Sequence, residues 1–473
     1  MSGVPSGALA GILLGALKSV GHAVCSTSGE AEQPGGLLTL AERVRRALAG
    51  RDIAPNEPVH VTIGNRPSDL GALLGVWQAG AVAVPIHVSA AASTVERVQR
   101  TSRARFSIDG DRLDAFGQAT PPDRPLLSDA ALVIFTSGST GEPKGVVIGH
   151  RRLADKLAVL DSLLKLRSND IVLLPLQHTF IFGLWVSLLA LMKGARLVLV
   201  PKFTREAMKS GLAEASVLAG VPTMFRTLLS DPAVAAPKLR SVLSGGEVLS
   251  PGVARAIVRL APAAIHDLYG LTETGSCDFC LGPADRPQGF GTIGRPTERV
   301  VFRLVRDGRT VAAGETGEMQ IHTPFGMSGY LDNPQLTAAS FDAGYFRTGD
   351  IARLTAAGYV ELVGRANDII SRGGNKIAPL EIDNLLAEHP DIAAALCAGV
   401  ADERLGEVIH AVIVPRTGVR IDTAGLRDWL VARTERFKVP DVFHIRDALP
   451  SGSSGKADRR AVAQLAANEA NRR

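Results

Sequence analysis

Short apolar runs alternate with helical stretches over the first two-thirds of the chain. The segments ALVIF at 131–135 and RLVLV at 196–200 are short, apolar and rich in branched residues, which is typical of buried strands. Alternation of such strands with helices predicts an α/β arrangement with largely parallel sheets. The Pro-rich stretch at 120–125 is expected to lead into the strand at 131–135.

The pattern changes beyond about residue 365. Pro379 and Glu381 are expected to open a helix that Pro390 stops, and Thr423 is expected to cap a second helix. Strands are expected at 393–400, 408–415 and 442–445. These elements predict a small α+β unit of about a hundred residues that forms its own domain.

Length and composition narrow the class of protein. The chain has 473 residues, more than one compact core usually holds, so two or more domains are expected. The apolar runs at 8–17 and 181–192 fall short of the ~20 residues that a bilayer requires, so we expect packed helices and no membrane span. The 52 Lys and Arg against 47 Asp and Glu are spread along the chain, which argues against nucleic-acid binding. Basic residues become more frequent from Arg433 to Arg460, where we prefer a solvated surface to a patch for a phosphorylated ligand.

Four cysteines in so long a chain do not form a disulfide scaffold. This favours a reducing compartment and predicts a cytoplasmic protein. Cys277 and Cys280 form a single C-x-x-C pair, and no second pair completes a zinc site. Incidental packing is therefore the preferred interpretation over metal or redox chemistry.

The segment FTSGSTGEPKGVV, from Phe135 to Val147, directly follows a predicted strand. Its small residues leave backbone N–H groups and hydroxyls free to bind phosphate oxygens, while the lysine adds positive charge. A Walker A loop is excluded, because Pro143 precedes the lysine and Gly145 follows it, where that motif requires Ser or Thr. The predicted phosphate-binding residues are Thr136, Ser137, Gly138, Ser139, Thr140, Gly141 and Lys144.

This segment resembles the signature of the adenylate-forming (AMP-binding) superfamily, which includes acyl-CoA synthetases, peptide-synthetase adenylation domains and luciferases. The family's other motifs follow in order: SGGE at 244–247, DLYGLTETG at 267–275, FRTGD at 346–350, GRAND at 364–368 and PSGSSGK at 450–456. The resemblance implies the acyl-CoA synthetase branch. It also implies an α/β protein with a large multi-sheet N-terminal domain and layered helices (1–364), a hinge (365–368) and a small mobile α+β C-terminal domain (369–473).

The resemblance assigns a nucleotide contact to several motif residues. Tyr269 is similar to the aromatic residue that stacks on adenine, and Asp267, where many members carry Asn, can accept from the adenine amino group. Asp350 matches the carboxylate that receives the ribose hydroxyls, and Arg365 matches the arginine near the domain junction. The metal ligand for Mg²⁺ is expected to be Glu273. Further expected contacts are Gly245, Gly246, Glu247, Gly270 and Thr272 with the nucleotide, and Thr136 with Mg²⁺.

Further positions concern catalysis, domain movement and the path of the thiol. Lys456 matches the lysine that stabilises the transition state when a carboxylate attacks the α-phosphorus of ATP. His178 matches a histidine beside the reaction centre that gates between acid pocket and thiol tunnel. The family hinge falls on Asn367, where most members have Asp or Lys. The pantetheine thiol is expected to pass Gly373 and Gly374, which lack side chains and allow close backbone approach.

The acyl pocket is expected to be apolar and to favour an uncharged tail. Its predicted lining is Phe180, Gly183, Val221, Phe225, Leu271 and Gly275. Arg226 leaves one alternative open, because malonyl-type ligases pair an arginine in this segment with a second carboxylate. The register of Arg226 differs from that arginine by one position.

The preferred hypothesis is an acid:CoA ligase that uses ATP, Mg²⁺ and coenzyme A, with the catalytic residues Lys456, His178 and Glu273. An adenylating enzyme that loads a carrier-protein phosphopantetheine thiol is the first alternative, and the lack of a fused carrier domain favours CoA over it. A non-catalytic nucleotide-binding regulatory homologue is the second, and the presence of Glu273 and Lys456 argues against it. The expected partners are a small carboxylic acid, ATP and the thiol, with the chain a monomer or homodimer.

Overall fold

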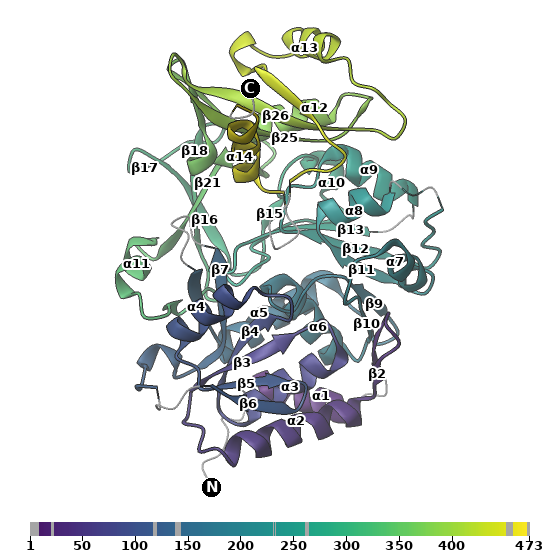
Figure 1. Ribbon diagram of the computed structural model, residues 1–473, viewed down its shortest axis with the longest axis vertical. Helices are drawn as coiled ribbons and strands as arrows, with labels where there is room; N and C mark the ends of the chain where they lie inside the picture. The colour runs from purple at the N-terminus through teal and green to yellow at the C-terminus, as the bar shows by residue number, and fades with distance from the viewer. Residues whose placement is uncertain are drawn as a thin grey trace.

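The computed structural model describes residues 9–19, 23–116, 121–137, 143–229, 231, 233–260, 264–450 and 457–470. These residues form four β-sheets, and Figure 1 shows the C-terminal elements stacked above the N-terminal ones. No helix in the described part of the chain is both long and apolar enough to cross a membrane.

A seven-stranded sheet carries the segment that precedes the predicted phosphate loop. Its central strands β4, β3 and β5 are parallel, and β7 and β8 form an antiparallel hairpin at one side. In spatial order the strands are β19 (Gly329–Tyr330), β8 (Pro143–Gly149), β7 (Ala130–Ser137), β4 (Val82–His87), β3 (Pro58–Ile63), β5 (Phe106–Asp109) and β6 (Arg112–Ala115).

A nine-stranded sheet carries the SGGE and DLYGLTETG motifs. Its six central strands, β13, β12, β11, β9, β10 and β1, are parallel, whereas β2 at one edge and β14 and β15 at the other pair antiparallel. In order the strands are β15 (Arg295–Pro296), β14 (Phe279–Leu281), β13 (Ala264–Tyr269), β12 (Ser241–Gly245), β11 (Val217–Gly220), β9 (Ile171–Leu174), β10 (Arg196–Leu199), β1 (Val24–Ser26) and β2 (Ala31–Glu32). The parallel centres of both sheets confirm the predicted α/β arrangement.

Helices cover both sheets. The largest apolar core lies between them and includes α1, α3, α5 and α6, whereas α7, α8 and α9 enclose a second core on the nine-stranded sheet. The helices are α1 (Leu9–Ser19), α2 (Pro34–Ala49), α3 (Pro67–Gln78), α4 (Ala92–Ser102), α5 (His150–Leu164), α6 (Ile181–Lys193), α7 (Arg205–Leu212), α8 (Pro222–Leu229), α9 (Pro251–Leu260), α10 (Arg286–Gly289), α11 (Pro334–Ala339) and the 3₁₀ turn η1 (Pro125–Leu127). Because α1 packs against α6, both apolar runs of the sequence are packed helices as predicted.

A six-stranded antiparallel sheet, which the sequence pattern did not separate from the α/β region, carries Asp350 and Arg365. Its strands are β17 (Arg309–Thr310), β16 (Val301–Arg306), β18 (Thr316–His322), β21 (Tyr345–Leu354), β20 (Phe341–Asp342) and β22 (Val360–Arg365). The 3₁₀ turn η2 (Ala366–Asp368) then leads to the last sheet.

The C-terminal elements form a separate five-stranded sheet with its own apolar core. The strands are β24 (Asn375–Ile377), β23 (Ile370–Arg372), β26 (Gly406–Pro415), β25 (Ile392–Asp402) and β27 (Val442–Ile445), and the helical segments are α12 (Pro379–Ala387), α13 (Thr423–Val431), η3 (Arg436–Lys438) and α14 (Arg459–Ala470). One expected detail is wrong, because Thr423 does not cap α13. Asp422 is the N-cap, and its side chain accepts from Ala424 N at 3.0 Å.

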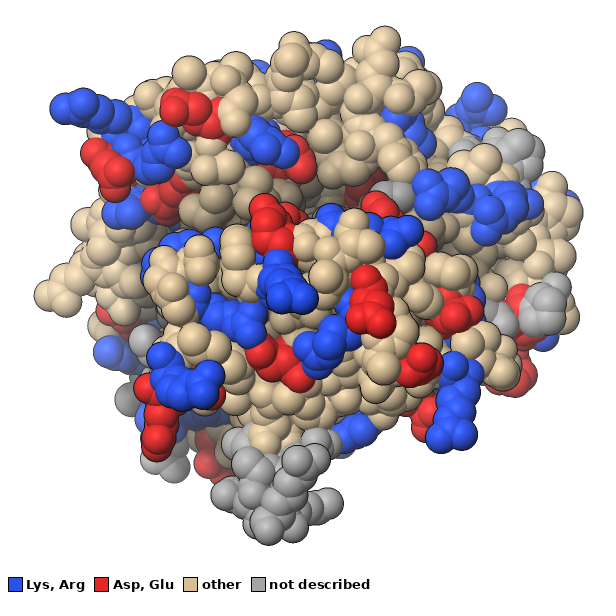
Figure 2. All heavy atoms as spheres, turned by 90° about the horizontal axis from the view of Figure 1, so that it is seen from above, with Lys and Arg blue, Asp and Glu red and all other residues tan. Residues whose placement is uncertain are grey.

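Charges on the face formed by the C-terminal elements are mixed, with Lys and Arg interspersed among Asp and Glu (Figure 2). Lys438 donates to Glu381 at 2.6 Å, and Arg459 donates to Asp383 at 2.5 Å. These two basic residues of the C-terminal stretch are therefore paired with neighbouring carboxylates.

Candidate active site

The predicted nucleotide motifs lie together because parallel strands end at the same edge of the nine-stranded sheet. On β12 and β13, Ser244 is opposite Asp267 and Gly245 is opposite Leu268. Gly246 follows with a φ of +83°, a conformation that favours glycine. The SGGE and DLYG motifs therefore form adjacent parts of one surface.

The β7–β8 hairpin brings two predicted phosphate contacts together, because Thr136 is opposite Lys144. The Nζ of Lys144 lies 5.6 Å from the ring centre of Tyr330, and the Tyr330 hydroxyl donates to Glu273 Oε1 at 3.0 Å. Lys144 and the predicted metal ligand Glu273 therefore flank one tyrosine. Ser137 ends β7, whereas Gly138, Ser139, Thr140, Gly141 and Lys456 lie outside the described residues.

A second group forms around Asp350, which is 4% exposed. Its two carboxylate oxygens accept from Tyr269 Oη at 2.5 Å and from Arg365 Nε at 2.8 Å. Strand pairing explains the second contact, because Asp350 on β21 is opposite Arg365 on β22. Burial and the neighbouring Asp350 carboxylate raise the pKa of Tyr269, so its hydroxyl keeps its proton. Each carboxylate oxygen has a second lone pair, and Asp350 can still accept from ribose hydroxyls.

Asp267 lies on β13 beside these groups. Burial raises the pKa of the Asp267 carboxyl to about 7, although the charge of Arg286 opposes this shift. At the ordinary carboxyl pKa of about 4, an unfolded chain is already ionised at neutral pH. Ionised Asp267 is therefore a source of instability in the ligand-free protein.

Asp267→Asn is expected to raise the thermal unfolding temperature above about pH 7 and to have a much smaller effect at about pH 4. The sign follows because the folded state holds its proton up to about pH 7, whereas the unfolded state releases it near pH 4. The penalty thus grows over this window and is complete above it. Thermal unfolding temperatures measured from about pH 4 to about pH 8 test this prediction. Asp428→Asn is the control, because Asp428 is exposed. If the unfolding temperatures of Asp267→Asn and of the parent chain change with pH in parallel, the prediction is wrong.

Glu247 has protein partners for its carboxylate. It accepts from the Thr223 hydroxyl at 2.7 Å and from Ala457 N at 3.3 Å, and its Oε2 lies 3.6 Å from Arg226. The contact with Ala457 joins the loop after β12 to the segment that directly follows Lys456. Arg226, considered above as a receptor for a second carboxylate, already pairs with Glu247.

The predicted acyl-pocket residues are brought together only in part. Val221 and Leu271 pack in the core between the two large sheets, whereas Phe225 packs in the second core against Gly220. Phe180 at the start of α6 is 36% exposed. Gly183 and Gly275 allow close packing, because an added Cβ would meet Gln177 O at 2.4 Å and Phe325 O at 2.5 Å, respectively.

His178 is fully buried just before α6. Its Nε2 is 2.8 Å from Ser187 Oγ, and its Nδ1 has no hydrogen-bond partner in the part of the chain that the structure describes. Burial lowers the pKa of His178 to about 4, so the ring is neutral at physiological pH. A neutral ring enclosed by side chains fits a gate residue better than a general acid.

One residue assigned to domain movement lies between the six-stranded and five-stranded sheets, and the two assigned to the thiol path lie at a turn of the five-stranded sheet. Asn367 is in η2, between Arg365, which pairs with Asp350, and Asp368, which lies 3.7 Å from Arg459. Gly373 and Gly374 form the exposed turn between β23 and β24, with φ values of +54° and +85°.

Within the described residues, no group of three or more His, Cys, Asp or Glu side chains is arranged to hold a metal ion. Mg²⁺ is nonetheless often bound by one or two carboxylates together with nucleotide phosphates, and Glu273 fits this mode. Cys277 and Cys280 are buried, and burial raises the pKa of the Cys277 thiol to about 12. Burial also raises the pKa of the Cys280 thiol, and both side chains pack in the apolar core.

Sequence reasoning missed two side chains that contact the site loop. Tyr330 binds Glu273, and Lys156 on α5 donates to the carbonyl of Cys277 at 2.8 Å. Lys156 could have been found, because it interrupts the apolar face of α5 that carries Leu153, Leu157 and Leu160. Tyr330 is distant in sequence from every motif and gave no such signal.

Comparison with known proteins shows the family of this chain. Residues 35–331 match the family model described as AMP-binding enzyme, and residues 381–456 match that of the AMP-binding enzyme C-terminal domain. A feruloyl-CoA synthase of an Amycolatopsis species is 32% identical over 459 residues, 89% of this chain and 92% of that protein. A fatty acid–acyl-carrier-protein ligase of Streptomyces coeruleorubidus is 29% identical over 471 residues, 89% of each chain. An anthranilate CoA ligase crystallised with anthranoyl-AMP shares the fold, with a TM-score of 0.87 at 22% identity over 98% of each chain.

The layered α/β sheets, the antiparallel sheet and the small C-terminal sheet, with nucleotide motifs at the strand ends, define an adenylate-forming enzyme. The extent of the family match and the identity with the feruloyl-CoA synthase show that the chain belongs to the AMP-binding enzymes. The family predicted from the ordered motifs is thereby confirmed.

Proposed function

We propose that this chain is an AMP-forming acid:CoA ligase. A carboxylate oxygen of the acid attacks the α-phosphorus of ATP, which forms an acyl-AMP anhydride and releases pyrophosphate. The thiol of CoA then attacks the acyl carbonyl, which forms the thioester and releases AMP. The similarity to the feruloyl-CoA synthase over 89% of the chain supports both steps.

One observation carries this proposal. Tyr269 contacts Asp350, and Glu273 contacts Tyr330 beside Lys144, so the DLYGLTETG motif links the predicted ribose contact to the predicted phosphate and Mg²⁺ contacts. In the proposed complex, Asp350 accepts from the ribose while Lys144 attracts phosphate oxygens. Glu273 holds Mg²⁺, which supplies positive charge to the phosphate oxygens when it is bound.

We infer that the acid has an uncharged tail. The proposed lining residues are apolar or small, and the Glu247 carboxylate already compensates the charge of Arg226. The feruloyl group, which gives the relative its name, likewise has an uncharged aromatic tail. These points favour an aryl or aliphatic monocarboxylate over a dicarboxylate.

The proposed domain arrangement is a large domain over 1–364, a hinge over 365–368 with Asn367 at its centre, and a small domain over 369–473. Rotation at the hinge would carry Gly373 and Gly374 to the thiol path for the second step. The separate apolar core of the C-terminal sheet supports a unit that moves as one body. Four free thiols support the expected cytoplasmic location.

A carrier-protein thiol is the alternative acceptor, and the similarity to a fatty acid–acyl-carrier-protein ligase over 89% of the chain favours keeping it. Both acceptors end in the same phosphopantetheine thiol, so the adenylation step is common to both. The test must therefore separate acid activation from acceptor choice.

A panel of aryl, fatty and dicarboxylic acids tests the proposal by pyrophosphate release and AMP formation, with CoA, with a phosphopantetheinylated carrier protein, and with no acceptor. We expect turnover with at least one uncharged-tail acid, and acceleration by CoA. If the carrier protein accelerates AMP formation and CoA does not, the carrier protein is the acceptor in place of CoA. If no acid yields pyrophosphate or AMP while the protein is folded, the proposed ligase activity is wrong.

A further inference from the structure

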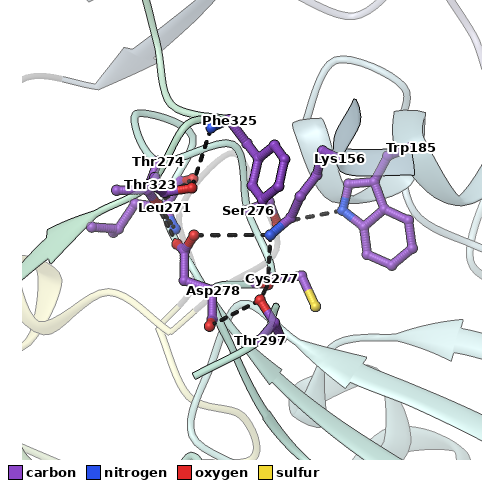
Figure 3. A network of polar contacts seen from close by, with 10 residues as sticks. All are labelled: Lys156, Trp185, Leu271, Thr274, Ser276, Cys277, Asp278, Thr297, Thr323 and Phe325. Carbon is purple, nitrogen blue, oxygen red and sulfur yellow. Dashed lines mark hydrogen bonds and ion pairs between the residues drawn. The ribbon is translucent and has the colours of Figure 1, made fainter. Parts of the chain in front are cut away.

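A buried lysine lies behind the loop that carries the proposed nucleotide contacts. Lys156 on α5 is 0% exposed, and its Nζ donates to Cys277 O at 2.8 Å. The same Nζ lies 4.0 Å from Asp278 Oδ1 and 5.1 Å from the ring centre of Phe325 (Figure 3). A charged lysine is rarely buried without a specific partner, so this placement requires an explanation.

The backbone that Lys156 holds has an unfavourable conformation. Three consecutive residues, Gly275, Ser276 and Cys277, have φ values of +85°, +67° and +50°. Only the first is a glycine, and left-handed backbone in other residues persists where surrounding contacts hold it. Besides Lys156, two more donors lie outside the loop: Thr297 Oγ1 donates to Cys277 O at 3.0 Å, and Trp185 Nε1 donates to Ser276 Oγ at 3.4 Å.

The next residue, Asp278, is also fully buried. Its Oδ2 accepts from the Thr274 hydroxyl, whereas its Oδ1 has no hydrogen-bond donor among the described residues. The ammonium of Lys156 is therefore the charge that balances this carboxylate. Burial raises the pKa of Asp278 to about 6, and Lys156 opposes that shift.

These contacts continue to the other side of the loop. Thr274 Oγ1 accepts from Leu271 N at 3.2 Å, and Asp278 N donates to Tyr269 O at 2.7 Å. Between these points lies Glu273, which contacts Tyr330. A displacement of residues 276–278 would thus be transmitted through these hydrogen bonds to the start of the loop at Tyr269 and Leu271, and to Glu273 in its middle.

We propose that Lys156 is a positioning residue that fixes the 269–278 loop by holding the Cys277 carbonyl and the Asp278 carboxylate, and so sets the geometry of Glu273. The inference rests on the proposed function, because Glu273 is assigned there as the Mg²⁺ ligand. Lys156 itself does not contact the reacting atoms. Its effect is transmitted through Cys277, Asp278 and Thr274.

Four variants test this role by calorimetric titration with Mg²⁺·ATP and by thermal unfolding. Lys156→Met leaves Asp278 buried without a cation and is expected to weaken both nucleotide affinity and the fold. The double variant Lys156→Met/Asp278→Asn restores the charge balance, but Cys277 O still lacks the hydrogen bond from Lys156. Thr297→Val removes the other donor and leaves the ion pair intact. Lys193→Met is the control, because it breaks a lysine–aspartate pair with Asp161 at the far end of α6.

We expect the double variant to unfold near the temperature of the parent chain but to bind Mg²⁺·ATP about tenfold more weakly, because small displacements of site groups have large effects. Thr297→Val is expected to weaken binding about threefold, and Lys193→Met to have no effect. A folded double variant with parental affinity would show that Lys156 only balances charge and would overturn the inference. If the double variant does not fold, parental affinity in Thr297→Val overturns it instead. Because binding is measured without an acid, a parent chain that binds Mg²⁺·ATP but activates no acid contradicts the proposed function alone.

Discussion

Lys456→Ala is expected to lower the rate of acyl-adenylate formation by about 10²- to 10³-fold, the usual effect of removing one preorganised charge from a transition state. Attack of a carboxylate on the α-phosphorus brings two negative groups together, and a lysine between them stabilises that arrangement. Ala457, the first described residue after Lys456, donates its N–H to Glu247 of the SGGE motif at 3.3 Å.

The two half-reactions separate this role from a general loss of structure. Pyrophosphate exchange measures adenylation, and thioester formation from preformed acyl-AMP measures the second step, which is expected to stay within a few-fold of the parent rate. Lys438→Ala is a matched control, because this lysine of η3 is also C-terminal to the proposed hinge but pairs with Glu381 and Glu435. Equal loss of both half-reactions in Lys456→Ala would contradict the assigned role.

The contacts around η2 give the proposed hinge a physical basis. Arg365 pairs with Asp350 on one side of Asn367, and Asp368 lies 3.7 Å from Arg459 on the other. Rotation at Asn367 would leave each of these pairs within its own domain. The Ala457–Glu247 hydrogen bond, by contrast, joins residues on opposite sides of the proposed hinge and would have to break in such a rotation. It is therefore a marker of the arrangement in which residue 457 lies beside the SGGE motif.

Local sequence signals predicted the elements that depend on local chemistry. The apolar runs at 131–135 and 196–200 are strands because their side chains are buried on both faces of parallel sheets. The helix cap was missed by one residue, since Asp422 and Thr423 are both capable caps and only backbone geometry decides between them. The antiparallel sheet that carries Asp350 was not predicted, because its partner strands are set by register and not by composition.

The same limit applies to the candidate site. Motif order predicted Tyr269, Asp350 and Arg365 as separate nucleotide contacts, and the structure joins the three side chains through one carboxylate. That contact requires strands of two different sheets to meet, which no single segment specifies. Glu247, another motif residue expected at the nucleotide, accepts from Thr223 and Ala457, and no motif predicted these protein contacts.

Asp350→Asn is expected to raise the KM for ATP by about 10²-fold and to have a smaller effect on the KM of the acid. The carboxylate accepts from Tyr269 at 2.5 Å and from Arg365 at 2.8 Å, and hydrogen bonds to charged groups contribute about 1.5–3 kcal/mol each. An amide offers only one acceptor oxygen, so its NH₂ group must face one of these two donors. A loss of about 3 kcal/mol corresponds to the expected change in affinity.

Two comparison variants separate the charge of Asp350 from its neighbours. Asp342→Asn removes a carboxylate that binds Arg303 at 2.6 Å in the same sheet but is largely exposed, and it is expected to leave the KM for ATP unchanged. Tyr269→Phe keeps the aromatic ring and removes one donor, so it is expected to raise that KM by about tenfold, less than Asp350→Asn. Steady-state kinetics at saturating acid measure all three. A parental KM for ATP in a folded Asp350→Asn variant would mean that Asp350 holds Tyr269 and Arg365 together without receiving the ribose, and the nucleotide role proposed for it would be wrong.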